Sequence, residues 1–180
     1  MPPSVTVESE AEEGNPMLTI EDYAKLPREQ RMQRLTRTAD EFSAAIKGPS
    51  DAVLARRPDG KNWAAKEVVC HMRDTEEVFG ARIEQILAMD VDLKLIATNP
   101  DRWAEERQYL TNDAGKALAA FGQRRVETLE TFGKLTQAQW EKGGLHSTAG
   151  RITLDGFLSI MAWHDDNHLD QLMRALQGRA

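Results

Sequence analysis

Two histidines four residues apart, His164 and His168, form the pattern in this sequence that points most directly to chemistry. On an α-helix, side chains at this spacing project from one face with their Cβ atoms about 5–6 Å apart. That separation suits two ligands of one metal ion. Metalloprotease helices of the His-Glu-x-x-His type use the same spacing. Here Asp165, Asp166 and Asn167 fill the interval, so this sequence does not carry that motif.

The helical register around this pair is apolar, and His71 stands in a similar setting between Val68 and Met72. The other residues of the first register are Phe157, Met161, Leu172 and Ala175. An imidazole buried there loses its hydrogen bonds to water, and a metal ion would compensate that loss. The pair of His164 and His168 alone is explained equally well by helix-surface or satisfied core positions, and His71 alone is explained better by a core histidine bonded to a carbonyl or a carboxylate. Together the three favour a metal site, because an open catalytic zinc site uses three protein ligands.

Three carboxylates stand close enough in the sequence to orient these histidines. A metal-bound histidine usually donates its second ring N–H to a carboxylate, a carbonyl or water. Asp165 precedes His168 by three residues, and Glu67 and Asp74 flank His71 at i−4 and i+3. Each can alternatively be a solvated surface charge, which is the interpretation we favour for the neighbouring Asp166 and Asp170.

Other reactive residue types favour structural roles. His146 lies in a glycine-rich connection, where an exposed loop position is a better expectation than a ligand or an acid–base role. Cys70 points about 100° away from His71 on an ideal helix, which predicts a small core or interface residue and not a nucleophile. Trp63 and Trp163 are expected to pack rather than to stack on a ligand.

Four long segments have the three- and four-residue apolar spacing of amphipathic helices. They cover residues 28–47, 62–89, 113–135 and 153 onward, and Asn62 and Thr153 are the expected caps of the second and fourth. Because no alternating β pattern is evident, we predict an all-α four-helix bundle. Residues 90–112 are long enough to run back along a helix, so the second and third helices can be parallel, and Arg102 and Trp103 within this crossover can cover a pocket.

Composition and charge narrow the classes of function. The chain has 180 residues, which fits one domain, and we read residues 1–16 as a flexible acidic tail before a domain at 17–180. A net charge of −6 argues against nucleic acid as a partner. A single cysteine excludes an internal disulfide, and no apolar run is long enough for a membrane span. We therefore expect a cytoplasmic protein.

Two runs of the sequence resemble a known family. Residues 62–71 hold a tryptophan and a Glu-Val pair before His71, and residues 163–171 hold His-x-x-x-His followed by Gln171. Both resemble the DinB-like, or YfiT-like, superfamily of metalloenzymes, and the likeness covers about residues 20–178. The resemblance implies an up-down-down-up bundle, often a homodimer, that binds zinc or nickel through His71, His164 and His168. Characterised relatives include thiol S-transferases and a thiol-dependent isomerase.

Three functions remain open at this point. Three neutral imidazoles leave a divalent ion one position for a small molecule. The ion can activate water for hydrolysis, or it can bind a low-molecular-weight thiol as thiolate for S-transfer. A third possibility is a binding or stress-response module without catalysis, in which a fourth protein ligand closes the site. We expect the thiol transferase, with the metal-dependent hydrolase as its alternative.

Overall fold

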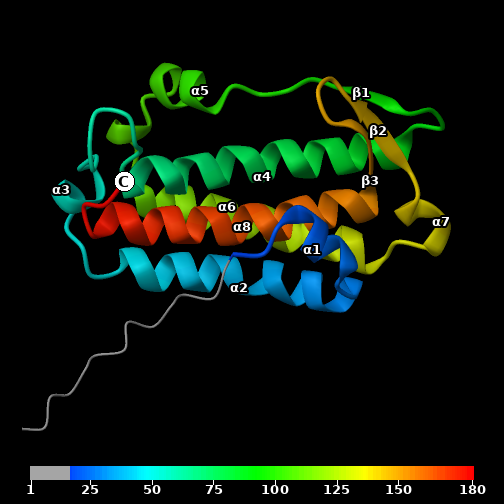
Figure 1. Cartoon of the computed structure of the whole chain (residues 1–180), viewed down its shortest axis with the longest axis horizontal. Helices are drawn as coiled ribbons and strands as arrows, with labels where there is room; N and C mark the ends of the chain where they lie inside the picture. Colours follow the sequence, from blue (N-terminus) through cyan, green and yellow to red (C-terminus); the bar gives the residue numbers. More distant parts are fainter. Residues whose placement is uncertain (1–16) are drawn as a thin grey trace, which may run out of the picture.

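The computed structural model describes residues 17–180, and its main body is a bundle of four long helices (Figure 1). These helices are α2 (Arg28–Ile46), α4 (Ala65–Ala88), α6 (Ala114–Gly133) and α8 (Leu154–Leu176). The predicted helical bundle is confirmed. The predicted acidic tail at residues 1–16 lies outside the described residues. None of the described helices is long and apolar enough to cross a membrane.

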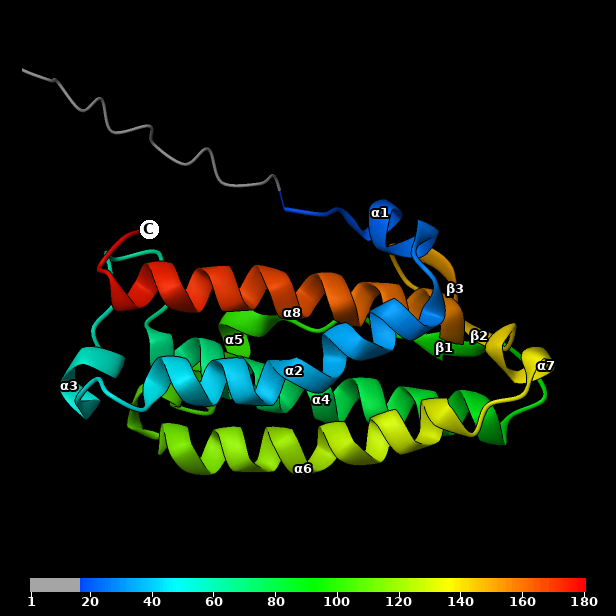
Figure 2. The same ribbon diagram turned by 90° about the horizontal axis from the view of Figure 1, so that it is seen from below.

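The two middle helices of the chain run in the same direction. In Figures 1 and 2, α4 and α6 run parallel to each other, and α2 and α8 run the opposite way. The connection between α4 and α6 therefore returns along the outside of the bundle, as its length predicted. It contains β1 (Leu93–Leu95), α5 (Pro100–Glu106) and the short 3₁₀ helix η1 (Tyr109–Thr111). This crossover places α5 beside the N-terminal half of α4 (Figure 1).

The helix starts follow from local hydrogen bonds, with one correction. Thr153 caps α8 by accepting a hydrogen bond from the Gly156 N–H, as expected. Asn62, however, does not cap the second long helix, because α4 begins at Ala65 with Ala64 at the N-cap position. The carboxylate of Glu67 accepts the Ala64 N–H at 2.9 Å and so fills the capping role from inside the first turn. The side chain of Asn62 instead donates to Asp59.

A small sheet at one end of the bundle was not predicted. The short helix α7 (Gln137–Trp140) leads into β2 (Gly143–His146), which pairs parallel with β1 and antiparallel with β3 (Gly150–Thr153). Strands of three or four residues are too short to show an alternating apolar pattern. Gly143 is required here, because a Cβ at this position would lie 2.4 Å from the carbonyl oxygen of Ile152. At the N-terminus, α1 (Ile20–Lys25) packs on α8 (Figure 2).

A charged layer divides the bundle core into two apolar halves. One half contains Phe42 and Phe121, and the other contains Phe132 and Phe157. Between them, the buried guanidinium of Arg125 donates to both carboxylate oxygens of Asp165 and to Glu76 at 2.8 Å. Thr38 also donates to Asp165. We call Arg125, Glu76, Asp165 and Thr38 the charged layer.

Candidate metal centre

Three histidine side chains meet on the inner faces of α4 and α8. His71 comes from α4, and His164 and His168 come from adjacent turns of α8. The Nε2 atoms of His71 and His164 are 3.1 Å apart, and one ring nitrogen from each of the three lies within 4.8 Å of the others. The i,i+4 pair therefore shares one face of its helix, as its spacing predicted, and the packing of α4 against α8 adds the third imidazole.

Aromatic rings hold the cluster in place. The ring of Trp63 lies 5.0 Å from that of His71, and Phe79 meets His164 edge-on at 5.7 Å between ring centroids. Trp63 was expected to pack, and it packs against His71 of this cluster. These contacts restrict ring rotation and cover two of the three imidazoles with apolar surface.

Burial keeps the three imidazoles neutral. It lowers the pKa of His71 to about 3, with repulsion from His168 as the second cause and Asp74 opposing. Burial also lowers the pKa of His164 well below its ordinary value and lowers that of His168. Neutral imidazoles present lone pairs, which is the state that a metal ion requires.

The nitrogen geometry suits a divalent ion. At metal–nitrogen distances of about 2.0–2.1 Å in a tetrahedral shell, two ligand nitrogens lie roughly 3.3–3.4 Å apart. The 3.1 Å between the Nε2 atoms of His71 and His164 is close to that value. In the absence of an ion, the Nε2 atoms of His71 and His164 can share only one N–H between them, whereas an ion would accept a lone pair from both. The donor set therefore fits a metal ion.

Gln171 orients His168. Its Oε1 lies 2.7 Å from His168 Nδ1, and because an amide oxygen only accepts, Nδ1 carries the proton. The lone pair of His168 is then on Nε2, the nitrogen that a metal would use. In the sequence, Gln171 stands out only as part of the pattern that resembles the family. Its position three residues after His168, on the same helix face, was the signal for this contact. The Thr75 hydroxyl lies 3.3 Å from both ring nitrogens of His71.

The three carboxylates proposed as orienting groups have other partners. Asp165 belongs to the charged layer, and Glu67 binds Arg57 and the Ala64 N–H. In the described chain, neither they nor Asp74 hydrogen-bond a histidine ring. A buried carboxylate gains more from a cation than from a neutral imidazole, which explains the difference.

Asp74 holds the crossover instead. It accepts hydrogen bonds from Arg73, Arg107 and the hydroxyl of Tyr109, and the last two of these residues follow α5. Its carboxylate also counteracts, through space, the lowering of the His71 pKa. Asp74 therefore fastens the segment that covers the site.

A cavity of about 280 Å³ opens beside the histidines. Its walls are His71, Thr75, Val78, Phe79, Arg82, Thr98, Pro100, Trp103, His164 and His168. Trp103 belongs to the crossover, so this segment covers a pocket, as predicted. The cavity gives a small molecule direct access to the point where the imidazoles converge.

The family assignment follows from a comparison of sequences. Residues 34–172 match the model of the DinB superfamily. The chain belongs to this superfamily. No curated protein matches it at a significant level.

A similar solved structure comes from Bacillus subtilis. It is YfiT, described as "a probable metal-dependent hydrolase with an unusual four-helix bundle topology". The two chains share 20% sequence identity with a TM-score of 0.76, and the match covers 96% of this chain and 95% of YfiT. At this level of identity the likeness shows the fold of this DinB superfamily member and no more.

His146 and Cys70 stand apart from the histidine cluster of this DinB superfamily protein. The Nδ1 of His146 accepts the backbone N–H groups of Thr148 and Ala149, each at 3.3 Å, so its ring closes the turn between β2 and β3. It does not line the cavity beside the other histidines. Cys70 is fully buried in one apolar half of the core, where burial raises its pKa to about 11.

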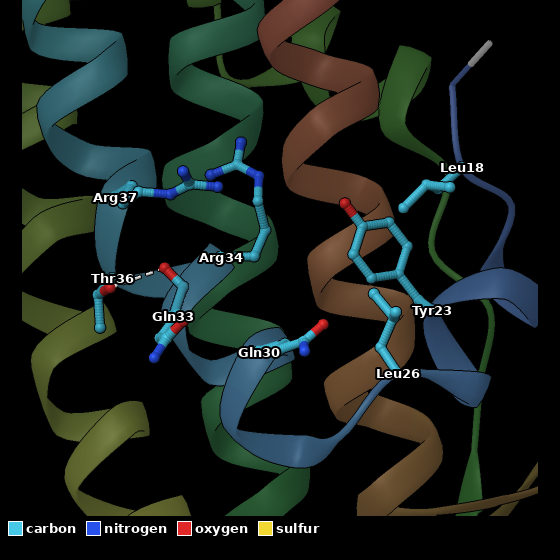
Figure 3. Close-up of a pocket in the computed structure, with 8 residues that line it drawn as sticks. All are labelled: Leu18, Tyr23, Leu26, Gln30, Gln33, Arg34, Thr36 and Arg37. Carbon is cyan, nitrogen blue, oxygen red and sulfur yellow. Dashed lines mark hydrogen bonds between the residues drawn. The ribbon is translucent and has the colours of Figure 1, made fainter. Parts of the chain in front are cut away.

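A larger hollow of about 640 Å³ lies between α1 and α2, away from the histidines (Figure 3). Figure 3 shows Tyr23 of α1 with its hydroxyl directed toward α8, where it donates to Asp166. Arg34 binds the same carboxylate. The side chain of Asp166 is 29% exposed and is paired with Arg34, so the solvated surface charge that we expected is wrong. No histidine or cysteine lines this hollow, so the histidine cavity remains the candidate site.

Proposed function

We propose that this protein is a metal-dependent enzyme in which His71, His164 and His168 hold one divalent ion at the wall of the 280 Å³ cavity. The observation that carries the proposal is the convergence of three neutral imidazoles on a point that a small molecule can reach. Zinc and nickel both suit nitrogen ligands of this kind. An ion held in this way supplies Lewis acidity to a group at its open coordination position.

The residues of the chain have separate tasks in this proposal. Gln171 keeps the proton of His168 on Nδ1 and so holds Nε2 ready as a ligand. Trp103 and Phe79 exclude bulk water from one side of the cavity, which strengthens electrostatic interactions inside it. Thr75 and Arg82 supply the polar groups that contact the substrate.

The reaction that we favour is S-transfer from a low-molecular-weight thiol. No aspartate or glutamate lines the cavity among the described residues, so the chain offers no carboxylate there as a general base. A thiol needs less help than water, because a coordinating thiol is deprotonated outright. A second hollow of about 250 Å³ shares Pro100 with the first, and its other lining residues are Lys61, Asn62, Trp63, Asp101 and Gln171. Two adjoining hollows suit two substrates.

Hydrolysis is the second candidate, and the description of YfiT as a metal-dependent hydrolase supports it. Both reactions use the same three histidines and differ in whether water or a thiol reacts. They are separable by experiment, because only one of them requires an added thiol.

The test is turnover by metal-loaded protein with an electrophile, in the presence and absence of a thiol, beside an ester substrate. We expect thiol-dependent loss of the electrophile that disappears in His164→Ala and persists in His146→Ala, the matched control outside the site. If the protein instead hydrolyses the ester without a thiol, and His164→Ala loses this activity, hydrolysis replaces S-transfer as the function. Turnover that survives His164→Ala would contradict both.

A further inference from the structure

Arg82 is an arginine without a carboxylate partner in the wall of the histidine cavity. It extends from α4, and its side chain is partly buried. Other arginines that are buried or partly buried in the described chain form ion pairs with aspartate or glutamate. They are Arg28, Arg31, Arg34, Arg73, Arg124, Arg125 and Arg174. Arg82 forms no such pair within residues 17–180.

The guanidinium of Arg82 therefore pays a desolvation cost that no acidic group offsets. Burial lowers its pKa, and no neighbouring carboxylate opposes that effect. A partly buried cation is normally compensated by a counter-charge. Since the described chain supplies none, a negatively charged ligand in the cavity would supply it.

The orientation of Arg82 leaves donors for such a ligand. Its Nη2 donates to the carbonyl oxygen of Ile96 in the crossover, which ties one arm of the guanidinium to the chain. In the described structure, Nε and Nη1 have no hydrogen-bond partner from the chain. A guanidinium that is held on one side and free on the other can bind an oxyanion through two parallel hydrogen bonds.

The remaining walls of the cavity complete a binding site. The three imidazoles are neutral, so Arg82 is the one cationic side chain among the described residues of the lining. Val78, Phe79 and Trp103 give an apolar surface on which the body of a substrate can lie. A molecule with one anionic end and an apolar body matches this arrangement.

We propose that Arg82 binds an anionic oxygen group of the substrate, a carboxylate or a phosphate, and directs the rest of the molecule along Phe79 and Trp103 toward the three histidines. This inference deepens the proposed function and rests on it, because the group bound by Arg82 belongs to a substrate only if the cavity is an active site. The anion site itself requires no metal ion.

Calorimetric titration of metal-free protein with benzoate tests the proposal, with benzamide as the neutral molecule of the same shape. We expect benzoate to bind about tenfold or more tightly than benzamide, and Arg82→Gln to remove that preference without changing benzamide binding. Arg102→Gln is the matched control, because Arg102 is exposed on α5 and pairs with Glu106. Phenyl phosphate in a parallel titration shows which oxyanion is preferred.

Equal binding of benzoate and benzamide by the unaltered protein would overturn the proposal, and this comparison requires no variant to fold. A benzoate preference that survives in Arg82→Gln would overturn it as well. The proposed function fails separately. If the protein binds no metal but prefers benzoate through Arg82, the metal enzyme is wrong and the anion site stands.

Discussion

Two buried polar groups lie side by side in this bundle and are stabilised in opposite ways. In the charged layer, the one guanidinium of Arg125 forms ion pairs with the carboxylates of both Glu76 and Asp165 within the chain. In the histidine cluster, His71, His164 and His168 are alike, neutral and turned toward one another. The first group is held by ion pairs within the chain, although Glu76 Oε1 and Arg125 Nε are buried without a hydrogen-bond partner among the described residues. The second presents converging ring nitrogens that a cation from outside can bind.

A single helix supplies both groups. His164 and Asp165 are neighbours in α8, and neighbouring residues of a helix point about 100° apart. One therefore faces the cavity while the other faces the centre of the bundle, where Arg125 of α6 meets it. The ion pairs of the charged layer fix the position of the turn of α8 that carries His164. We expect the layer to act on the metal site through the position of the helix rather than through a direct contact.

The largest effect is expected from removing the cation of the charged layer. Arg125→Met leaves Glu76 and Asp165 buried without compensation, which should lower the free energy of unfolding by about 3–5 kcal/mol. Urea unfolding measures this loss, and Arg37→Met, at a mainly exposed position, should change it by less than about 0.5 kcal/mol. A loss below about 1 kcal/mol in Arg125→Met would show that Arg125 does not offset the burial of the two carboxylates.

A smaller effect is expected from acid on the metal-free protein. The pKa of His71 is about 3 in the folded chain, while an unfolded histidine takes up its proton near 6.5. Below pH 6.5 the unfolded state therefore binds a proton that the folded state refuses, so stability falls as the pH falls. For His71 this amounts to about 2 kcal/mol between pH 7 and pH 5.

Urea unfolding of His71→Phe at both pH values isolates that contribution, because phenylalanine cannot take up a proton. The pH dependence should be weaker in this variant and unchanged in His146→Phe, whose ring lies in the turn outside the cluster. The same pH dependence in His71→Phe and the unaltered protein would mean that His71 is not held neutral by burial.

The orienting role of Gln171 predicts an effect on metal affinity. Gln171→Leu removes the acceptor for His168 Nδ1, so the ring loses its fixed tautomer and affinity should fall about 10- to 100-fold. Competition with a chelator measures the change. Gln177→Leu, an exposed position beyond the end of the same helix, should leave affinity unaltered. Equal metal affinities of the two variants would show that Gln171 does not orient His168 for metal binding.

The smallest effect tests the role of Asp74. Asp74→Asn weakens the contacts with Arg73, Arg107 and Tyr109, so thermal or urea unfolding should show a loss of about 1–2 kcal/mol. Metal affinity should change less than in Gln171→Leu, because Asp74 does not hydrogen-bond a histidine. A larger loss of metal affinity in Asp74→Asn would restore the orienting role that the sequence suggested for it.

The features that could be predicted from the sequence are those with a local period. The four long helices, the Thr153 cap and the shared face of His164 and His168 all depend on residues within a few positions of one another. The position of His71 beside that pair was predicted from its apolar setting and from the family resemblance. In the structure, the packing of α4 on α8 brings the three histidines together.

The features that could not be predicted depend on residues far apart in the chain. Asp165 meets Arg125 across 40 positions, and no periodicity in α8 distinguishes that pairing from one with His168. The pairing of β1 with β2 joins two segments about 50 residues apart, each too short to show a pattern. Arg82 became a candidate only when the structure showed that it lines the cavity without a carboxylate partner.

Elemental analysis tests the central claim most directly. The protein should be purified without chelator and without nickel resin, alongside His164→Ala and His146→Ala. We expect one equivalent of divalent metal per chain in the unaltered protein and in His146→Ala, and almost none in His164→Ala, with far-UV circular dichroism still helical in all three. Stoichiometric metal in folded His164→Ala, or none in the unaltered protein after dialysis against zinc or nickel salts, would contradict the account.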